Sequence, residues 1–304
     1  MTVVCSDVKG AKIAAAPTPP AQPAFHAPHP SQSAIRNPQS AILRPPLKWA
    51  GGKRWLVPRL RELWQPLRER RLVEPFAGGL AVSLGLQPAQ ALLNDINPHT
   101  INLYQQLQRG LTIDWEPQND ATAYYAARER FNTLIASGDS DGSEAAGLFY
   151  YLNRTGYNGL CRFNRRGQFN VPFGRYAQIT YTTDFAPYRA AFANWTFAHG
   201  DFAALAPAPN DVIYADPPYD VEFTQYSAGG FAWPEQERLA HWLAAHPGPV
   251  LLSNQATDRI VTLYERLGFT LEYHHAPRMI SCNGDRTRAR EVLAMRNVEC
   301  GVRN

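Results

Sequence analysis

The stretch DVIYADPPYD, residues 211–220, joins an apolar run to an acid, two prolines and an aromatic residue. The run VIYA is typical of a buried strand, but a proline has no backbone N–H with which to continue the ladder of a central strand. We therefore expect the strand to end at Asp216. A rigid pair, Pro217 and Pro218, and the ring of Tyr219 follow that carboxylate directly.

These four residues suit chemistry on a planar amine. Such an amine is a poor nucleophile because its lone pair is delocalised into the ring. The Asp216 carboxylate and the Pro217 carbonyl can accept its two N–H groups, and the prolines hold both acceptors in place before the substrate arrives. The Tyr219 ring offers a face on which an extruded base can stack. We interpret Asp216, Pro217, Pro218 and Tyr219 as a catalytic set; the alternative is a Pro-Pro strand terminator beside a chance acid.

Two earlier stretches predict a cofactor site. LVEPFAGGLAVSL, residues 72–84, is typical of a strand, a glycine turn and a helix, and glycine there lets the backbone approach a bound molecule closely. LLNDIN, residues 92–97, places Asp95 at the end of the next strand, where a carboxylate can reach ribose hydroxyls. A tight turn alone would also explain Gly78. The combination of Gly78 and Asp95 favours a nucleotide-like cofactor.

A long segment between Glu144 and Asp184 contains no acidic residue. Arginines, aromatic residues and asparagines alternate along it, a combination that can hold phosphates, read base edges and stack on bases. A solvated loop that happens to lack acids is the alternative. The basic residues of the segment are Arg154, Arg162, Arg165, Arg166 and Arg175.

From Leu47 onward, short apolar stretches alternate with helical ones, which predicts a parallel sheet covered on both faces, with ligands at the carboxyl ends of its strands. The expected strands are 72–74, 91–94, 195–198, 212–215 and 250–253, and the clearest helices are 235–246 and 257–267. Residues 99–184 interrupt the alternation and are expected to form an inserted, mainly helical domain. Residues 1–44, rich in Pro, Ala and Ser, are expected to be a disordered tail.

The composition narrows the class of protein. At 304 residues and 45% apolar content, the chain can bury a full core, and its net charge is only +4. No apolar run approaches the length of a membrane helix or resembles a secretory signal, so a cytoplasmic location is expected. The four cysteines lack the paired spacing of a zinc site or a disulfide framework, so no metal is expected.

The chain resembles the DNA adenine methylase family of amino-methyltransferases. The motifs LKWAGGK, VEPFAGG, LNDIN, YLNRTGYNGLCRFNRRGQFNVPFGRY, DPPY, LLSN and ISCNG occur in that family's order between Leu47 and Asn297. The resemblance implies a Rossmann-like class I methyltransferase sheet and S-adenosyl-L-methionine as methyl donor. The cofactor residues that it implies are Trp49, Lys53, Phe76, Gly78, Asp95, Asp201, Phe202 and Asp216. Leu80 stands where the family often has a second glycine, so no contact is expected there.

The same resemblance implies a double-stranded DNA partner and the target GATC. In the inserted segment Tyr157 matches a residue that wedges beside the target base, and Arg162 matches an arginine that reads a guanine. The complete set of implied DNA-binding residues is Lys48, Tyr157, Asn158, Leu160, Arg162, Asn164, Pro172 and Arg175. Residues 45–98 and 185–304 would form the catalytic domain, and residues 99–184 the target-recognition domain.

The sequence therefore predicts a DNA adenine-N6 methyltransferase that needs no metal and no obligate protein partner. Methylation of RNA adenine or of a protein glutamine amide is the alternative within enzymes, because related motifs act on other planar amines. The segment rich in arginines and aromatic residues argues against the protein substrate. A DNA-binding module that has lost catalysis is the alternative outside enzymes, and the intact Lys53, Asp95 and DPPY set argues against it.

Overall fold

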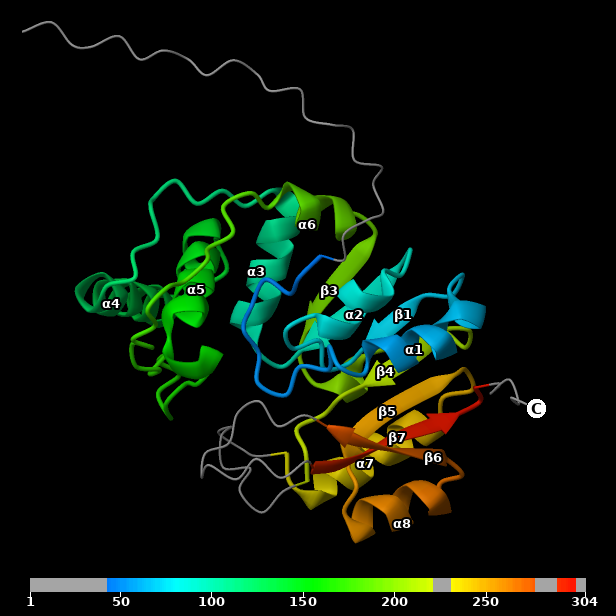
Figure 1. Ribbon diagram of the computed structural model, residues 1–304. Coiled ribbons are helices and arrows are strands. Elements are labelled where there is room, and N and C mark those ends of the chain that lie inside the picture. The colour runs from blue at the N-terminus through cyan, green and yellow to red at the C-terminus, as the bar shows by residue number, and fades with distance from the viewer. Residues whose placement is uncertain (1–42, 221–230, 277–288, 299–304) are drawn as a thin grey trace, which may run out of the picture. The chain divides into compact units, whose positions relative to one another are not determined.

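The computed structural model describes residues 43–220, 231–276 and 289–298, all within one compact unit (Figure 1). Residues 1–42 of the expected tail lie outside the described residues. The last two residues of that tail are described. Leu43 packs against the hydrophobic core, and the carbonyl of Arg44 accepts a hydrogen bond of 2.8 Å from the Tyr188 hydroxyl. Leu43 and Arg44 therefore contribute to the packed fold.

A seven-stranded sheet in the order β3-β2-β1-β4-β5-β7-β6 forms the centre of this unit. Strand β7 runs antiparallel to both of its neighbours, and the other pairs are parallel. The strands are β1 (Leu72–Glu74), β2 (Ala91–Asp95), β3 (Trp195–His199), β4 (Val212–Ala215), β5 (Val250–Gln255), β6 (Thr270–Ala276) and β7 (Ala289–Arg296). This arrangement confirms the predicted Rossmann-like sheet of mainly parallel strands. Strands β6 and β7 are additional to the strands expected from the sequence.

Helices cover both faces of the sheet because successive strand residues point to opposite sides. Leu72, Tyr214 and Leu251 belong to one core cluster, whereas their neighbours Val73 and Ile213 belong to the other. The first cluster is covered by α1 (Val57–Trp64), α2 (Ala81–Leu86), α3 (Pro98–Arg109) and α6 (Ala186–Ala191), and the second by α7 (Trp233–Ala244) and α8 (Asp258–Arg266). The predicted two-sided covering is confirmed. None of the helices in the described ranges is long and apolar enough to cross a membrane.

The order in which successive strands are added reverses at the centre of the sheet. Strand β1 has β2 on one side and β4 on the other, so the order reverses between β1 and β4. In open α/β sheets ligands bind at the carboxyl ends of the strands beside such a reversal. Glu74, Asp95 and Asp216 stand at or directly after the ends of β1, β2 and β4. The fold thereby gathers acidic residues at the edge where a ligand is expected.

The segment expected to be an inserted domain begins with helices that continue the packing of the sheet. Helix α3 packs on β2 and β3, α5 (Ser143–Thr155) packs on α3, and α4 (Ala121–Ser137) packs on α5, as Figure 1 shows. The side chains of Asn97 and Asp120 cap α3 and α4 by accepting backbone N–H groups. Buried residues of α3 and α5 belong to the same core cluster as the sheet. The helices expected between residues 99 and 184 are present, and their action as a separate recognition domain stays a prediction.

Glu74 yields a prediction about stability. Burial, reinforced by the charge of Asp216, raises the pKa of Glu74 to about 8, although Ser83 donates a hydrogen bond of 2.5 Å to its carboxylate. A raised pKa means that the neutral form stabilises the fold, so stability is lost as pH rises through about 8. We expect Glu74→Gln, which stays neutral and keeps the acceptor, to unfold at the wild-type temperature at pH 5 and at a higher temperature at pH 9. Thermal unfolding of the ligand-free proteins tests this.

The matched control is Glu69→Gln, because the Glu69 side chain is 88% exposed. Its melting temperature should follow that of the wild type at both pH values. If the curves of Glu74→Gln and the wild type run parallel from pH 5 to pH 9, the assignment of a neutral Glu74 is wrong.

Candidate active site and DNA interface

The carboxylate of Asp216 lies directly after β4 and is held by two side chains from distant parts of the chain. Lys53 Nζ is 3.0 Å from Asp216 Oδ1, and Ser253 Oγ donates a hydrogen bond of 2.8 Å to the same oxygen. Lys53 is 3% exposed, whereas the Asp216 side chain is 21% exposed. Within the part of the chain that the structure describes, both contacts fall on Oδ1. The second oxygen, Oδ2, is therefore the one available to a substrate amine.

Hydrogen bonds from buried side-chain amides hold the backbone that follows Asp216. Gln236 Nε2 donates a hydrogen bond of 2.8 Å to the Pro218 carbonyl. Asn254 Nδ2 in turn donates to Gln236 Oε1 and to the Tyr264 hydroxyl, both at 2.9 Å. Gln236 and Asn254 are 1% and 0% exposed. The motif LLSN contains Asn254, but the sequence offered no role for it, because Gln236 comes from helix α7.

Tyr219 is anchored at its hydroxyl. The hydroxyl donates a hydrogen bond of 2.5 Å to Glu291 Oε2 on β7, and Lys53 Nζ lies 4.5 Å from the centroid of the ring. Burial raises the pKa of both Tyr219 and Glu291. Tyr219 therefore stays a neutral donor over the physiological range. Sequence reasoning missed Glu291 because it did not identify β7 as a strand.

The predicted cofactor residues Gly78 and Asp95 are in direct contact. Asp95 Oδ2 accepts the Gly78 N–H at 2.9 Å, and Oδ1 accepts the Asn97 N–H at the same distance. Burial raises the pKa of Asp95, which is 8% exposed. Gly78 has a φ of +47°, and a Cβ there would lie 2.8 Å from the indole nitrogen of Trp49. Glycine is therefore required both by its backbone conformation and by the indole packed against it.

Three other predicted cofactor residues form an aromatic and ionic group on the opposite face of the sheet from α1. Phe202 is 3% exposed, and its ring centroid is 5.7 Å from that of Phe76. Arg238 covers Phe202 at 4.0 Å and forms an ion pair of 2.6 Å with Asp201. Asp201 thus already has a partner, and Phe202 is a core residue as well as a candidate contact.

Ile96 is an apolar candidate that sequence reasoning did not single out. It follows Asp95 at the carboxyl edge of β2 and is 70% exposed. An exposed large apolar side chain beside a buried carboxylate offers a surface for a ring next to an acceptor for hydroxyls. The motif LNDIN contains Ile96, so its position after the acid was visible in the sequence, but its exposure was not.

Lys48 lies just before Trp49 in the chain and contacts the arginine-rich segment. The backbone N–H and carbonyl of Lys48 bond reciprocally to the side-chain amide of Asn153, at 2.8 and 2.9 Å. Its Nζ donates a hydrogen bond of 2.6 Å to the Arg154 carbonyl and lies 3.7 Å from the centroid of the Tyr176 ring. A Cβ on Gly159 would lie only 2.3 Å from Lys48 Cβ, so the two backbones approach closely. The predicted DNA-binding residue Lys48 therefore packs on the acid-free segment between Glu144 and Asp184.

Tyr157 and Asn158 lie at the turn that follows α5. Tyr157 is 49% exposed, and its backbone N–H donates a hydrogen bond of 2.9 Å to the Pro172 carbonyl. Asn158 has a φ of +52°, a left-handed conformation that asparagine tolerates better than most residues. The exposed ring of Tyr157 is consistent with the predicted wedge beside a target base.

Arg162 and Asn164 are oriented by neighbours within the same segment. Arg162 donates to Asn170 through Nε, at 2.8 Å, and through a terminal nitrogen to the Asn170 carbonyl, at 3.2 Å. Asn164 Oδ1 accepts the backbone N–H groups of Arg166 and Gln168 at 2.9 and 3.0 Å. Asn164 therefore closes a turn, which is a structural role beside its predicted DNA contact.

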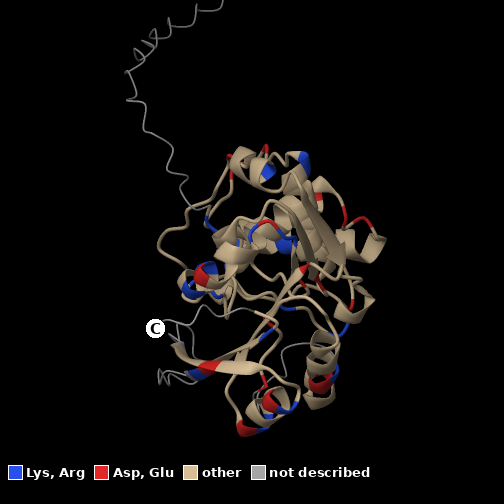
Figure 2. Cartoon of the chain, turned by 90° about the vertical axis from the view of Figure 1, so that its right-hand side faces the viewer, with Lys and Arg blue, Asp and Glu red and all other residues tan. Residues whose placement is uncertain are grey.

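The remaining predicted DNA-binding residues differ in exposure. Leu160 is half-buried against the core, whereas Arg175 is exposed with a φ of +50°. Figure 2 colours the basic residues of the described chain blue and the acidic ones red, and the sequence shows that no acidic residue lies between Glu144 and Asp184. Basic residues thus border Tyr157 without acidic neighbours in the same stretch of chain.

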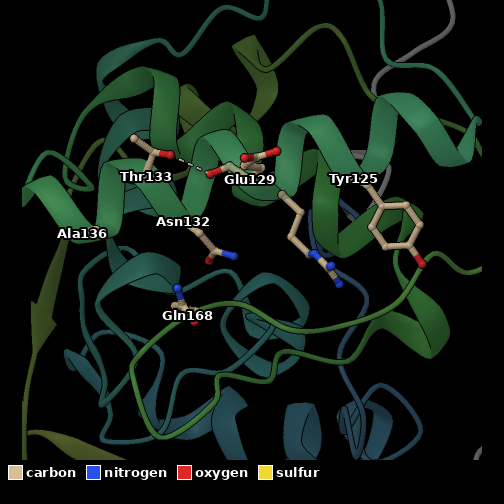
Figure 3. A pocket seen from close by; sticks show the side chains of 7 residues that line it. Tyr125, Glu129, Asn132, Thr133, Ala136 and Gln168 are labelled. Atoms are coloured by element: carbon tan, nitrogen blue, oxygen red, sulfur yellow. Dashed lines mark hydrogen bonds between the residues drawn. The ribbon is translucent and has the colours of Figure 1, made fainter.

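A pocket also lies between α4 and the turn that contains Gln168 (Figure 3). Asn132 of α4 reaches this turn and bonds to the backbone of Phe169 through both ends of its amide, at 2.7 and 3.1 Å. None of the predicted site residues lines the pocket. Its lining residues are Tyr125, Arg128, Glu129, Asn132, Thr133, Ala136 and Gln168.

With this geometry established, comparison with known proteins identifies the family. Residues 49–280 match the family described as D12 class N6 adenine-specific DNA methyltransferase. The chain belongs to this family. The resemblance on which the sequence analysis rested is thereby confirmed. The match begins one residue after Lys48 and ends before Glu291, so neither residue is part of the matched region.

Individual relatives agree with the family. The retron Ec67 DNA adenine methylase of Escherichia coli is 35% identical over 271 residues, which cover 84% of this chain and 92% of that protein. The DNA adenine methylase of Escherichia coli K12 is 36% identical over 270 residues, covering 82% and 94%. The DNA N-6-adenine-methyltransferase of Escherichia phage P1 is 36% identical over 278 residues, covering 85% of this chain. The chain spans only about a third of that phage protein, 36% of its length.

Lys48 yields a prediction about this D12 class chain. Burial, together with the charge of Arg154, lowers the pKa of Lys48 to about 8. Lys48 is therefore charged at pH 7 and loses its charge as pH rises through about 8. We expect DNA binding to weaken between pH 7 and pH 9, by up to about tenfold, the contribution of one hydrogen bond from a charged group. Lys48→Arg keeps the charge and should remove most of this pH dependence.

Fluorescence anisotropy with a labelled duplex at constant ionic strength measures the effect, since phosphate contacts depend strongly on salt. Lys48→Met is the matched control and should bind weakly at both pH values. Equal pH dependence in all three proteins would show that another group is responsible.

Proposed function

We propose that this protein transfers a methyl group from S-adenosyl-L-methionine to the N6 amine of an adenine extruded from duplex DNA, within GATC. The observation that carries the proposal is the placement of Asp216. Its Oδ1 is occupied by Lys53 and Ser253, and its Oδ2 is available at the carboxyl end of β4. The glycine turn after β1 and Asp95 at the end of β2 stand at the same edge of the sheet.

The residues at this edge suit the proposed cofactor. The Asp95 carboxylate can accept ribose hydroxyls, and the exposed Ile96 side chain can pack against the adenine ring. Lys53 and Asp216 offer paired charges, and Gly78 brings the backbone close. The full proposed set is Trp49, Lys53, Phe76, Gly78, Asp95, Ile96, Asp201, Phe202 and Asp216. When bound, S-adenosyl-L-methionine supplies a methyl group activated by its positively charged sulfonium.

Asp216 and Pro217 then make the amine nucleophilic. Asp216 Oδ2 and the Pro217 carbonyl accept its two N–H groups, which localises the lone pair on N6. Gln236 keeps these acceptors in place by holding the Pro218 carbonyl. Bound S-adenosyl-L-methionine would supply the methyl group to N6, and Asp216 accepts the proton that N6 releases. The Tyr219 ring stacks on the extruded base throughout.

The DNA is held by the acid-free segment. Tyr157 wedges into the space beside the extruded base, and Arg162 reads a guanine in the major groove. Lys48 contacts an outer base of the site. Asn158, Leu160, Asn164, Pro172 and Arg175 complete the proposed surface.

Incubation of the purified protein with methyl-labelled cofactor and either GATC duplex DNA, RNA or protein extract tests the substrate class. We expect label in adenine N6 of the duplex. Label confined to RNA or to protein would overturn the proposal.

Asp216→Ala tests the catalytic assignment. Loss of one preorganised acceptor commonly costs about 10² to 10³ in rate. We expect methyl transfer to fall by at least that factor while DNA binding, measured by anisotropy, changes little. Melting temperature must be measured in parallel, because Lys53 loses its partner.

Asp141→Ala, which removes an exposed carboxylate outside the proposed site, should keep wild-type activity. Near-normal turnover of Asp216→Ala would remove Asp216 from the mechanism.

Arg162→Ala and Arg166→Ala form a matched pair for sequence reading. Arg162 is held in orientation by Asn170, whereas Arg166 is exposed. An arginine that forks onto a guanine contributes about 1–3 kcal/mol of discrimination. We expect Arg162→Ala to narrow the gap in methylation rate between GATC and duplexes with the guanine changed. Arg166→Ala should weaken all duplexes alike or have no effect.

The assay is methylation of duplexes that differ by one base pair, at constant salt. Full preference for the guanine in Arg162→Ala would locate the readout elsewhere.

A further inference from the structure

Glu291 is a buried carboxylate that the proposed mechanism does not use. It lies on β7, is 8% exposed, and accepts a hydrogen bond of 2.5 Å from the Tyr219 hydroxyl. Strand β7 runs antiparallel to β5, beside which it lies in Figure 1. It begins more than 70 residues after Asp216 in the chain. A carboxylate from the far end of the chain is thus bonded directly to the last residue of the DPPY motif.

Several charged or titratable groups surround Glu291. Lys53 lies close to the Tyr219 ring, at 4.5 Å, and attracts the Glu291 carboxylate, whereas Asp216 repels it. On the neighbouring strands Gln255 and His274 stand opposite Glu291 in register. His274 pairs with Glu272 at 3.0 Å. Burial and Asp216 raise the pKa of Glu291, and Lys53 and the Tyr219 hydroxyl oppose that rise.

We propose that Glu291 is a positioning residue that holds the Tyr219 ring in place for the target base. A tyrosine side chain rotates about two torsions, and only its backbone end is fixed by the two prolines. The bond to Glu291 fixes the other end. Stacking is favoured when the ring is held in position before the base arrives, because ordering the side chain at that moment costs conformational entropy. This inference rests on the proposed function, in which Tyr219 stacks on an extruded adenine.

A purely structural role would give Glu291 a different signature. In that case its loss would lower stability without changing the transfer step in the folded protein. A positioning role instead lowers kcat in proteins that remain folded and leaves the KM for the cofactor unchanged. It also requires the effects of Tyr219 and Glu291 to depend on each other.

A double-mutant cycle separates these roles. Tyr219→Phe removes only the hydroxyl, Glu291→Ala removes the acceptor, and Glu291→Gln keeps an uncharged acceptor. We expect kcat on GATC duplexes to fall about tenfold in each of the first two, within the range of about 2 to 150 that contacting residues show. The double variant should be no slower than the slower single variant, and Glu291→Gln should retain most of the activity. The fluorescence of a duplex with 2-aminopurine at the target position should differ from that with the wild-type protein in Tyr219→Phe, in Glu291→Ala and in their double variant.

Additive losses in the cycle, or wild-type kcat in Glu291→Ala, would overturn the inference. If Glu291→Ala does not fold, Glu291→Leu, which also removes the acceptor but fills the buried space, takes its place in the cycle with Tyr219→Phe. A wild-type protein that methylates the duplex while the cycle is additive leaves the proposed function standing. A wild-type protein that transfers no methyl group to DNA overturns the proposed function. In that case coupling in the free energy of unfolding of the same proteins supports the anchoring of Tyr219 by Glu291, and additivity overturns it.

Discussion

The ion pair between Lys53 and Asp216 is the interaction on which the rest of the site depends. Lys53 is 3% exposed, and a buried charge is tolerated only when a partner compensates for its lost hydration. Removing one partner of a buried pair typically costs about 3–5 kcal/mol, because the other charge is left uncompensated. The pair therefore ties the chain before α1 to the end of β4. It also occupies one oxygen of the carboxylate, the one that Ser253 contacts as well.

The short segment from Lys48 to Lys53 brings three parts of the molecule together. Its first residue is clamped by Asn153 of α5, Trp49 packs on the glycine turn, and its last residue reaches Asp216. A displacement of Lys48 would therefore also move Trp49 at the glycine turn and Lys53 at the Asp216 carboxylate, because only a few residues separate them in the chain. This connectivity provides a physical path between the proposed DNA-binding segment and the edge proposed for the cofactor.

Hydrogen bonds from buried amides and acids surround the loop that follows Asp216. Gln236 and Asn254 support it from α7 and β5, and Glu291 anchors Tyr219 from β7. Buried polar groups of this kind are costly unless they are satisfied, and here they satisfy one another. The prolines restrict the backbone torsions of the loop. The hydrogen bonds from these side chains also hold the Pro218 carbonyl and the Tyr219 side chain in place.

The sequence by itself determined the parts of this protein that depend on local pattern. The apolar run before Asp216, the glycine turn at Gly78 and Asp95 after the next strand predicted the sheet and the edge where its ligand would bind. Only the tertiary structure decided which side chains support those residues. Ser253, Gln236 and Glu291 come from different elements, and no spacing in the sequence shows that they meet. Hydrogen bonds and ion pairs between distant residues are set by how strands pair and helices pack, and that information is distributed over the whole chain.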